Sequence, residues 1–287
     1  MQGVLSTGQR GLNDAEKKVK LHMLVVANTN DPTVGKAAVV DMNNAIKTFD
    51  TIARFMGIQM QPVMKIYGKI YNKESVQKAI AALQPGENDI VVFYSSGHGF
   101  RKATDSRPYP YIDLRPKDDK TYNVNSLNIK DVYDSIRLKP KGARLNIIIS
   151  DCCNNIPGVI KVPGKSIVTE RGLTEWSRDN CAKLFLDTAA SLLITSAGVD
   201  ETASCDDESG SFCTIFLRAA IANNLAKTNR QPSWTNILNE TADATSYKAR
   251  HICCNPEKPC TQSKACSQHP IRLYEPGRPR VGLRRLF

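Results

Sequence analysis

The sequence predicts an α/β protein with a mainly parallel central sheet and helices on both faces. Apolar, β-branched runs of strand length alternate with segments whose apolar residues recur at helical spacing, which is typical of right-handed βαβ units. Two of the runs, residues 90–96 and 145–150, stop just before chemically capable side chains, His98 and Cys153. Because the active crevice of an open α/β sheet lies outside the carboxyl ends of its strands, these two side chains are expected to meet at one edge.

The strands are predicted from short apolar runs. The third and fourth are almost wholly apolar up to their polar ends, as expected of parallel strands that are buried on both faces. In chain order, the predicted strands are residues 21–28, 60–66, 89–96, 144–150, 191–197 and 269–274.

The helices are predicted from apolar spacing and from stop signals. Gly57 ends the first helix, and Pro85-Gly86 stops the second, because glycine closes helices readily and proline cannot continue them. In chain order, the predicted helices are residues 37–56, 73–83, 126–138, 211–227 and 234–247.

The periodic pattern breaks after Cys153, where the chain becomes rich in Gly, Pro, Lys and Arg. A loop of this length is usually functional or mobile. We therefore expect an N-terminal extension (1–20), one domain (21–250) with a long loop at 154–190, and a final segment (251–287). That segment carries a Cys-rich stretch, a last strand and a basic tail.

Composition excludes several function classes. The net charge of +11 is spread along the chain without a recognised binding motif, so no specific nucleic-acid partner is expected. No stretch approaches 18 uninterrupted apolar residues, so no membrane span is expected either. The first 20 residues have no apolar signal-peptide core, which fits a cytosolic protein or one whose leader has been removed.

Four of the nine cysteines cluster late in the chain. Their spacing lacks paired CxxC knuckles, so zinc is the least favoured reading. Disulfides and free thiols are equally favoured, and disulfides would indicate an oxidising compartment and a secreted protein. The four residues are Cys253, Cys254, Cys260 and Cys266.

The pairing of His98 with Cys153 indicates nucleophilic catalysis. A cysteine attacks as a thiolate, which a neighbouring histidine generates before it protonates the leaving group. Gly97 and Gly99 allow close backbone approach, and the backbone N–H groups of Gly99 and Cys153 would form an oxyanion hole. A lone buried Cys or His is usually structural, but the two together at strand ends favour catalysis. No third triad member is evident.

These motifs resemble the caspase-like cysteine peptidases. Ser95-Ser96-Gly97-His98-Gly99 is similar to the family's histidine strand end, and Asp151-Cys152-Cys153 to the nucleophile motif of the metacaspase branch. Segments 194–198, 201–203 and 210–212 resemble the family's later strand, loop and helix start. The 55 positions between His98 and Cys153 (153 − 98) are close to the roughly 50 of caspases. The resemblance covers residues 21–247 and implies the caspase-hemoglobinase fold, with Cys153 as nucleophile and not Cys152.

The resemblance also implies a substrate pocket. Metacaspases build an acidic pocket from residues that correspond here to Asp41, Ser96 and Asp151. Buried carboxylates are stabilised by a cation, so the pocket would select peptide or protein substrates with Arg or Lys before the scissile bond. An Asp-selecting caspase would need Arg there, and these motifs contain none. For Asp41, a solvated carboxylate near a helix N-terminus is the alternative.

Three features depart from the family pattern. Asn154-Asn155-Ile156 replaces the usual His-Ser-Gly, which leaves the geometry after the nucleophile open. Calcium-dependent members carry an acidic cluster, of which Asp113, Asp118 and Asp119 would be a remnant. A simple turn is the preferred interpretation of this segment, and no cofactor is certain. The late Cys-rich segment is not part of the pattern.

An Arg- or Lys-specific enzyme would find cleavage sites in its own loop, since nicking concentrates in exposed segments. The sites are Lys161, Lys165, Arg171 and Arg178. A catalytically inactive caspase-like scaffold is the alternative function, and ligation on the same dyad is a third.

Overall fold

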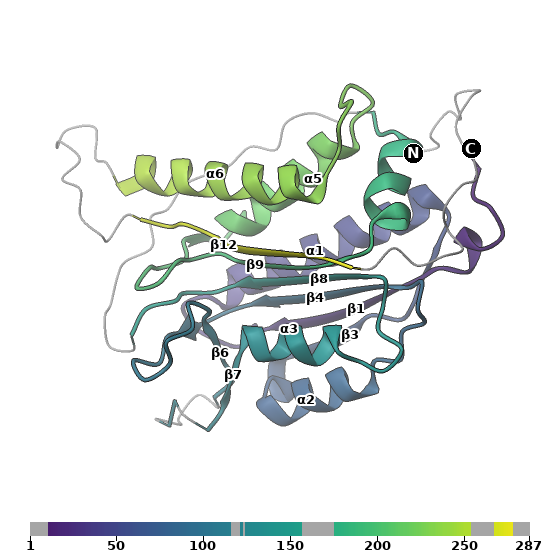
Figure 1. Cartoon of the computed structure of the whole chain (residues 1–287). Helices are drawn as coiled ribbons and strands as arrows, with labels where there is room; N and C mark the ends of the chain where they lie inside the picture. Colours follow the sequence, from purple (N-terminus) through teal and green to yellow (C-terminus); the bar gives the residue numbers. More distant parts are fainter. Residues whose placement is uncertain (1–10, 116–120, 123, 157–174, 254–266, 278–287) are drawn as a thin grey trace.

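The structure, a computed structural model, describes residues 11–115, 121–122, 124–156, 175–253 and 267–277. Its centre is a seven-stranded sheet in the order β12-β9-β8-β4-β1-β2, with β3 also paired to β1 (Figure 1). Neighbours run parallel except β12, which is antiparallel to β9. The strands are β1 (Lys20–Ala27), β2 (Gln59–Met60), β3 (Met64–Tyr67), β4 (Ile90–Ser96), β8 (Leu145–Asp151), β9 (Ala190–Thr195) and β12 (Ile271–Pro276).

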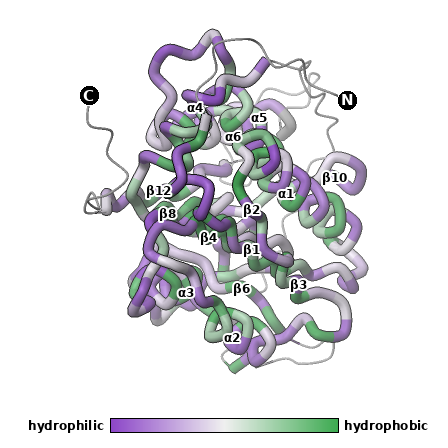
Figure 2. The backbone as a smooth tube through the Cα atoms, turned by 90° about the vertical axis from the view of Figure 1, so that its right-hand side faces the viewer, coloured by the Kyte–Doolittle hydropathy of each residue, from purple (hydrophilic) through white to green (hydrophobic). Residues whose placement is uncertain are grey.

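Helices cover both faces of the sheet. The four-helix face carries α1 (Gly35–Met56), α4 (Arg178–Ala182), α5 (Phe212–Leu225) and α6 (Trp234–Cys253), and the opposite face carries α2 (Lys73–Ala82) and α3 (Ile129–Arg137). The view in Figure 2 shows these two layers on either side of the strands. The predicted α/β class with a mainly parallel sheet is therefore confirmed.

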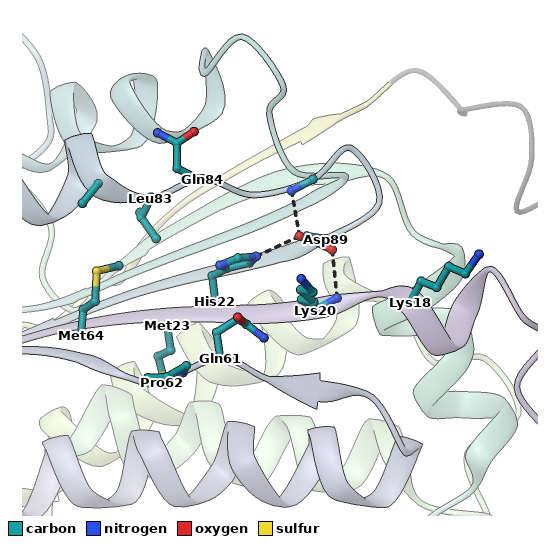
Figure 3. Close-up of a pocket in the computed structure, with 12 residues that line it drawn as sticks. Lys18, Lys20, His22, Met23, Gln61, Pro62, Met64, Leu83, Gln84 and Asp89 are labelled. Atoms are coloured by element: carbon teal, nitrogen blue, oxygen red, sulfur yellow. Dashed lines mark hydrogen bonds and ion pairs between the residues drawn. The ribbon is translucent and has the colours of Figure 1, made fainter.

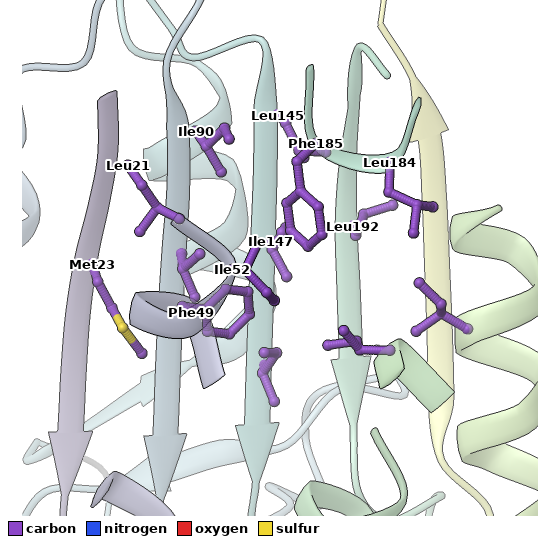
Figure 4. Packing of buried hydrophobic residues seen from close by; sticks show 14 of the residues in the cluster. Leu21, Met23, Phe49, Ile52, Ile90, Leu145, Ile147, Leu184, Phe185 and Leu192 are labelled. Carbon is purple, nitrogen blue, oxygen red and sulfur yellow. The ribbon is translucent and has the colours of Figure 1, made fainter. Parts of the chain in front are cut away.

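Each layer buries its own apolar cluster. On the α1 side, Phe49 and Ile52 pack with strand residues such as Ile90 and Ile147 (Figure 4). On the α2 and α3 side, a second cluster joins helix residues to Phe93. All seven residues of β4 and of β8 are buried, which explains why these two strands read as continuous apolar runs.

Local stop signals act as expected at the first helix. Gly57 adopts φ 80° at the end of α1, and its N–H bonds the carbonyls of Ala53 and Arg54, a left-handed ending that favours glycine.

The segment 60–66 is not one strand. It divides into β2 and β3 around Pro62, because proline offers no N–H to a sheet ladder. The chain also forms short elements that no sequence period reveals. They are the helical turns Glu16–Lys18 and Gly68–Ile70, a three-stranded sheet of β5 (Gly99–Phe100), β6 (Tyr111–Asp113) and β7 (Ser126–Asn128), and the β10–β11 hairpin (Cys205–Asp206 and Gly210–Ser211).

The carboxyl-terminal part differs from prediction in two places. The expected loop 154–190 contains α4 and a π-helical turn, Lys183–Asp187, whose Leu184 and Phe185 are buried. Strand β12 completes the main sheet, so the domain extends beyond residue 250. Of the late cysteines, three lie outside the described residues and the side chain of Cys253 is also not described. Among the helices described, none combines the length and apolar character needed to cross a bilayer.

Candidate active site

His98 and Cys153 occupy equivalent positions on two adjacent strands. In the parallel register of β4 and β8, Ser96 lies opposite Asp151, and the N–H of Gly97 continues the ladder to the carbonyl of Asp151 at 3.2 Å. His98 and Cys153 each follow two residues later in the sequence. The sheet therefore delivers both residues to its carboxyl edge, where active crevices of such sheets lie.

Gly99 permits the close contact between these two strand ends. A Cβ added at Gly99 would lie 2.4 Å from the Sγ of Cys152 and 2.6 Å from the carbonyl oxygen of Cys153. The carbonyl of His98 accepts a hydrogen bond from the N–H of Asp113 at 3.0 Å. The backbone around the histidine is thus held in place, and a side chain at position 99 would force the nucleophile segment to shift.

The two adjacent cysteines differ in environment. Cys152 is 3% exposed, its Sγ lies 3.4 Å from the hydroxyl of Ser150, and burial raises its pKa well above the usual range. Cys153 is half-buried, and its Sγ lies 3.4 Å from the backbone N–H of Ala203. Since an N–H donor stabilises a thiolate, Cys153 is the better placed nucleophile.

His98 has a carboxylate partner that the sequence reasoning missed. Its Nε2 lies 3.2 Å from Oδ1 of Asp31 and 3.1 Å from the hydroxyl of Thr33. The hydrogen bond to Asp31 raises the pKa of His98, although burial opposes the rise. One feature of the sequence could have indicated this partner. The polar run that contains Asp31 follows the carboxyl end of β1, the strand that pairs with β4.

The structure brings Asp41, Ser96 and Asp151 together. The hydroxyl of Ser96 donates to Oδ2 of Asp41 at 2.8 Å. Asp41 is 0% exposed and Asp151 is 3% exposed. The alternative interpretation of Asp41 as a solvated carboxylate at the helix start is therefore wrong.

Two further residues hold these carboxylates and were not found from sequence. The N–H of Ser211 donates to Asp41 at 2.8 Å, and the hydroxyl of Thr214 donates to Asp151 at 2.7 Å. Gly210 precedes them with φ 90°, and a Cβ there would lie 2.2 Å from Asp41 Oδ1. The motif at 210–212 marked this segment in the sequence, but not which carboxylates it would contact.

Burial disfavours the charged forms of Asp41 and Asp151. Desolvation raises the pKa of Asp41, and the hydrogen bonds from Ser211 and Ser96, with the charge of Arg218, offset the rise only in part. Desolvation followed by repulsion from Asp41 raises the pKa of Asp151. Oδ1 of Asp151 is buried and accepts no hydrogen bond within the described part of the chain, although the Ser196 hydroxyl also lowers the pKa of this carboxyl. The pair would be stabilised by a cation.

The unusual residue after the nucleophile is well anchored. Asn154 is 0% exposed, and its backbone pairs with Asp200 and Glu201 through two hydrogen bonds of 2.9 Å. Its Nδ2 donates to the carbonyl of Pro108 at 2.7 Å. Asn154 thus fixes the chain directly behind Cys153 in place of the expected histidine.

The remaining predicted residues lie apart from this cluster. Asp113 accepts two hydrogen bonds from the guanidinium of Arg115, at 2.8 and 2.6 Å. Arg178 begins α4 and lies over the ring of Phe55. In the described segments, no group of three or more His, Cys, Asp or Glu residues is arranged to hold a metal ion. The predicted residues outside the described part are Asp118, Asp119, Lys161, Lys165 and Arg171.

A second histidine–aspartate pair lies at the opposite edge of the sheet. His22 Nε2 lies 2.9 Å from Asp89 Oδ2 in a cavity of about 520 Å³ that is also lined by Lys20 and Gln61 (Figure 3). This cavity adjoins the amino ends of β1 and β4, whereas His98 and Cys153 follow the carboxyl ends of β4 and β8.

Comparisons with known proteins agree with this arrangement. The caspase-domain family model matches residues 22–271. Among solved structures, the chain is similar to caspase-1 from Spodoptera frugiperda, with a TM-score of 0.51 and 13% identity over 95% of this chain and 92% of that chain. A likeness at this identity shows the fold alone, and no curated protein matches the chain. Because the family match spans most of the sequence, the chain belongs to the caspase-domain family of cysteine peptidases.

Proposed function

We propose that this protein is a cysteine endopeptidase of the metacaspase branch that cleaves after Arg or Lys. The observation that carries the proposal is the buried carboxylate pair, Asp41 and Asp151. One member lies two residues before Cys153, and the other is bonded to Ser96, two residues before His98. The proposed charge selectivity and the reacting groups therefore share the same two strand ends, to which α1 adds Asp41.

The proposed reaction uses His98 and Cys153 in sequence. The imidazole takes the thiol proton, and the thiolate attacks the scissile carbonyl carbon to form a C–S bond. The N–H groups of Gly99 and Cys153 stabilise the oxyanion. The imidazolium then protonates the leaving amine as the C–N bond breaks, and a water activated by the same imidazole hydrolyses the thioester.

The carboxylate pair supplies the proposed preference for a cationic residue before the scissile bond. The carboxylates are held by hydroxyl and amide donors from Ser96, Ser211 and Thr214, which fix their positions without neutralising them. A guanidinium or ammonium group would relieve their repulsion, whereas an acidic side chain would add to it. Since Ser211 in the β10–β11 hairpin contacts the fully buried Asp41, substrate entry requires this hairpin to move.

Autocleavage in the loop after the nucleophile is part of the proposal. Lys161, Lys165 and Arg171 are the proposed sites. Arg178 fits less well, because its peptide bond begins a helix and must unfold locally before it can enter an active site. The mass of the active protein measures this directly, and an active enzyme that contains only intact chain would contradict it.

Hydrolysis of short fluorogenic peptides ending in Arg, Lys or Asp tests the function, with and without calcium. We expect turnover after Arg or Lys that is lost in Cys153→Ala but retained in Cys152→Ala, which removes a buried neighbouring thiol. Turnover only after Asp would contradict the pocket assignment. No turnover by folded, reduced protein would instead favour the inactive scaffold, and an added amine nucleophile distinguishes hydrolysis from ligation.

A further inference from the structure

We infer that Asp31, together with Thr33, positions His98 and keeps the proton of the neutral imidazole on Nε2. The other ring nitrogen, Nδ1, then accepts the proton of Cys153. The inference rests on the proposed function in that it assigns His98 as the base. It adds a third component, supplied by the turn between β1 and α1, to the two strand ends that carry His98 and Cys153.

The hydrogen-bond network determines the histidine tautomer. The Thr33 hydroxyl donates to Oδ1 of Asp31 at 2.6 Å, so its lone pairs face the Nε2 of His98, 3.1 Å away. The carboxylate of Asp31 is also an acceptor, 3.2 Å from the same nitrogen. Two acceptors around Nε2 require a proton on it, which leaves Nδ1 unprotonated in the neutral ring and able to act as the base.

Asp31 is itself held rigidly. Its Oδ1 accepts the backbone N–H of Thr33 at 2.8 Å and of Val34 at 3.1 Å, and its carbonyl accepts the N–H of Gly35 at 2.9 Å. The turn before α1 therefore presents the carboxylate in one orientation. Such support is what a group needs if it is to orient a catalytic imidazole.

The charges around His98 favour its protonated form. Burial alone would raise the pKa of Asp31, but hydrogen bonds from His98 and Thr33 lower it below its usual range. Asp31 in turn raises the pKa of His98, as does Asp113, while Arg115 opposes the rise. A stabilised imidazolium favours proton transfer from the thiol, and thus thiolate formation at Cys153.

A purely structural role for Asp31, as the residue whose carboxylate holds the turn before α1, is the competing explanation. Asp31→Asn separates the two roles, because Asn satisfies N-terminal helix N–H groups about as well as Asp does but carries no charge. Asp89→Asn is the matched control, since it removes the carboxylate from the second histidine–aspartate pair, which has no place in the proposed reaction.

We expect Asp31→Asn to lower kcat by about 10- to 100-fold, part of the contribution of general acid–base catalysis, with KM nearly unchanged. The alkaline limb of the kcat/KM profile should shift to lower pH, because the hydrogen bond to Asp31 raises the pKa of His98. Asp31→Glu should restore part of the rate. Unchanged kcat and pH profile in folded Asp31→Asn, or an equal loss in Asp89→Asn, would overturn the inference.

Alkylation of Cys153 by iodoacetamide, followed by peptide mass mapping, needs no substrate. The rate near neutral pH should fall several-fold in Asp31→Asn and not in Asp89→Asn. If no peptide is cleaved by the wild-type protein but alkylation still depends on Asp31, the proposed specificity fails and the role of Asp31 stands. Equal alkylation rates in wild type and Asp31→Asn would overturn the role of Asp31 whatever the peptidase assay gives.

Discussion

The central strands carry histidine–aspartate pairs of similar geometry at both of their ends, which are called here the carboxyl edge and the amino edge of the sheet. At the carboxyl edge, His98 Nε2 lies 3.2 Å from Asp31, and at the amino edge, His22 Nε2 lies 2.9 Å from Asp89. Burial alone would raise the pKa of each aspartate, but in both cases hydrogen bonds from the histidine and from nearby backbone lower it. The pairs themselves therefore do not distinguish a reactive site from a structural one.

Their surroundings do distinguish them. Asp89 also accepts the backbone N–H groups of Lys20 and Gly86, at 2.9 and 2.7 Å, so it connects the start of β1 to the turn before β4. His98 instead follows the strand next to the one that carries the half-buried Cys153, and the buried carboxylates Asp41 and Asp151 lie at the ends of these strands. The chemistry therefore depends on which side chains follow the carboxyl ends of neighbouring strands.

The largest expected effect is a difference between the two histidines. His98→Ala should reduce kcat/KM by about 10²- to 10⁴-fold, the usual contribution of a general acid–base group. His22→Ala should change it less than about 2-fold, because His22 contacts Asp89 at the other edge. Peptide hydrolysis by the two purified variants measures this, and similar losses in both would remove the distinction between the edges.

The next effect concerns the pocket. Asp151→Asn should reduce kcat/KM for an Arg substrate by about 30- to 1,000-fold, which corresponds to about 2–4 kcal/mol for a lost buried charge partner. Thr214 and Cys153 stay in place, so alkylation of Cys153 serves as the control. An equal loss of alkylation rate would show that the variant damages the nucleophile and not the pocket.

The same pocket predicts a pH dependence of binding. Burial raises the pKa values of Asp41 and Asp151, so the free pair retains a proton that a bound cation expels. Affinity for an Arg peptide should therefore increase with pH until the free pair is ionised. Calorimetry on Cys153→Ala in buffers of different ionisation enthalpy should show release of about one proton, and buffer-independent heats would contradict this.

A smaller effect is expected from backbone crowding at Gly99. In Gly99→Ala, the new Cβ would lie 2.4 Å from Cys152 Sγ, which must displace the nucleophile segment at a cost of about 1–3 kcal/mol. Activity should fall about 10-fold or more, by the usual conversion of such energies. Gly11→Ala is the control, since a Cβ there meets nothing within 4 Å. Full activity in folded Gly99→Ala would show that the close approach is not required.

The smallest effect on activity is expected at the amino edge. Asp89→Asn should lower the free energy of unfolding by about 1–3 kcal/mol, because an amide cannot accept all the hydrogen bonds of the carboxylate. Its kcat should stay within about 2-fold of wild type, since Asp89 lies outside the proposed reaction. Thermal unfolding and peptide hydrolysis of the same preparation measure both quantities, and a rate loss without a stability loss would contradict the structural role of Asp89.

The strands and the position of the proposed catalytic pair could be predicted, because both follow from short local patterns in the sequence. The apolar runs of β4 and β8 indicated buried parallel strands, and their polar ends indicated where His98 and Cys153 would lie. Short elements such as the turn at Lys183–Asp187 escaped prediction, because a few residues of apolar sequence carry no readable period.

Long-range contacts escaped prediction for another reason. Asp31 contacts His98 at a sequence separation of 67 positions (98 − 31), and Ser211 contacts Asp41 at a separation of 170. Such contacts depend on how separate loops pack at the sheet edge, and a single sequence carries no signal for that packing beyond the order of the strands.

Covalent labelling by a peptide with an electrophilic carbonyl after Arg examines the nucleophile and the charge preference of the pocket in one experiment. Mass mapping should find the adduct on Cys153 in the wild type, almost none in His98→Ala, and much slower formation with the matched Asp peptide. An adduct on another cysteine, or preferential labelling by the Asp peptide, would contradict the proposed nucleophile or the proposed cationic pocket.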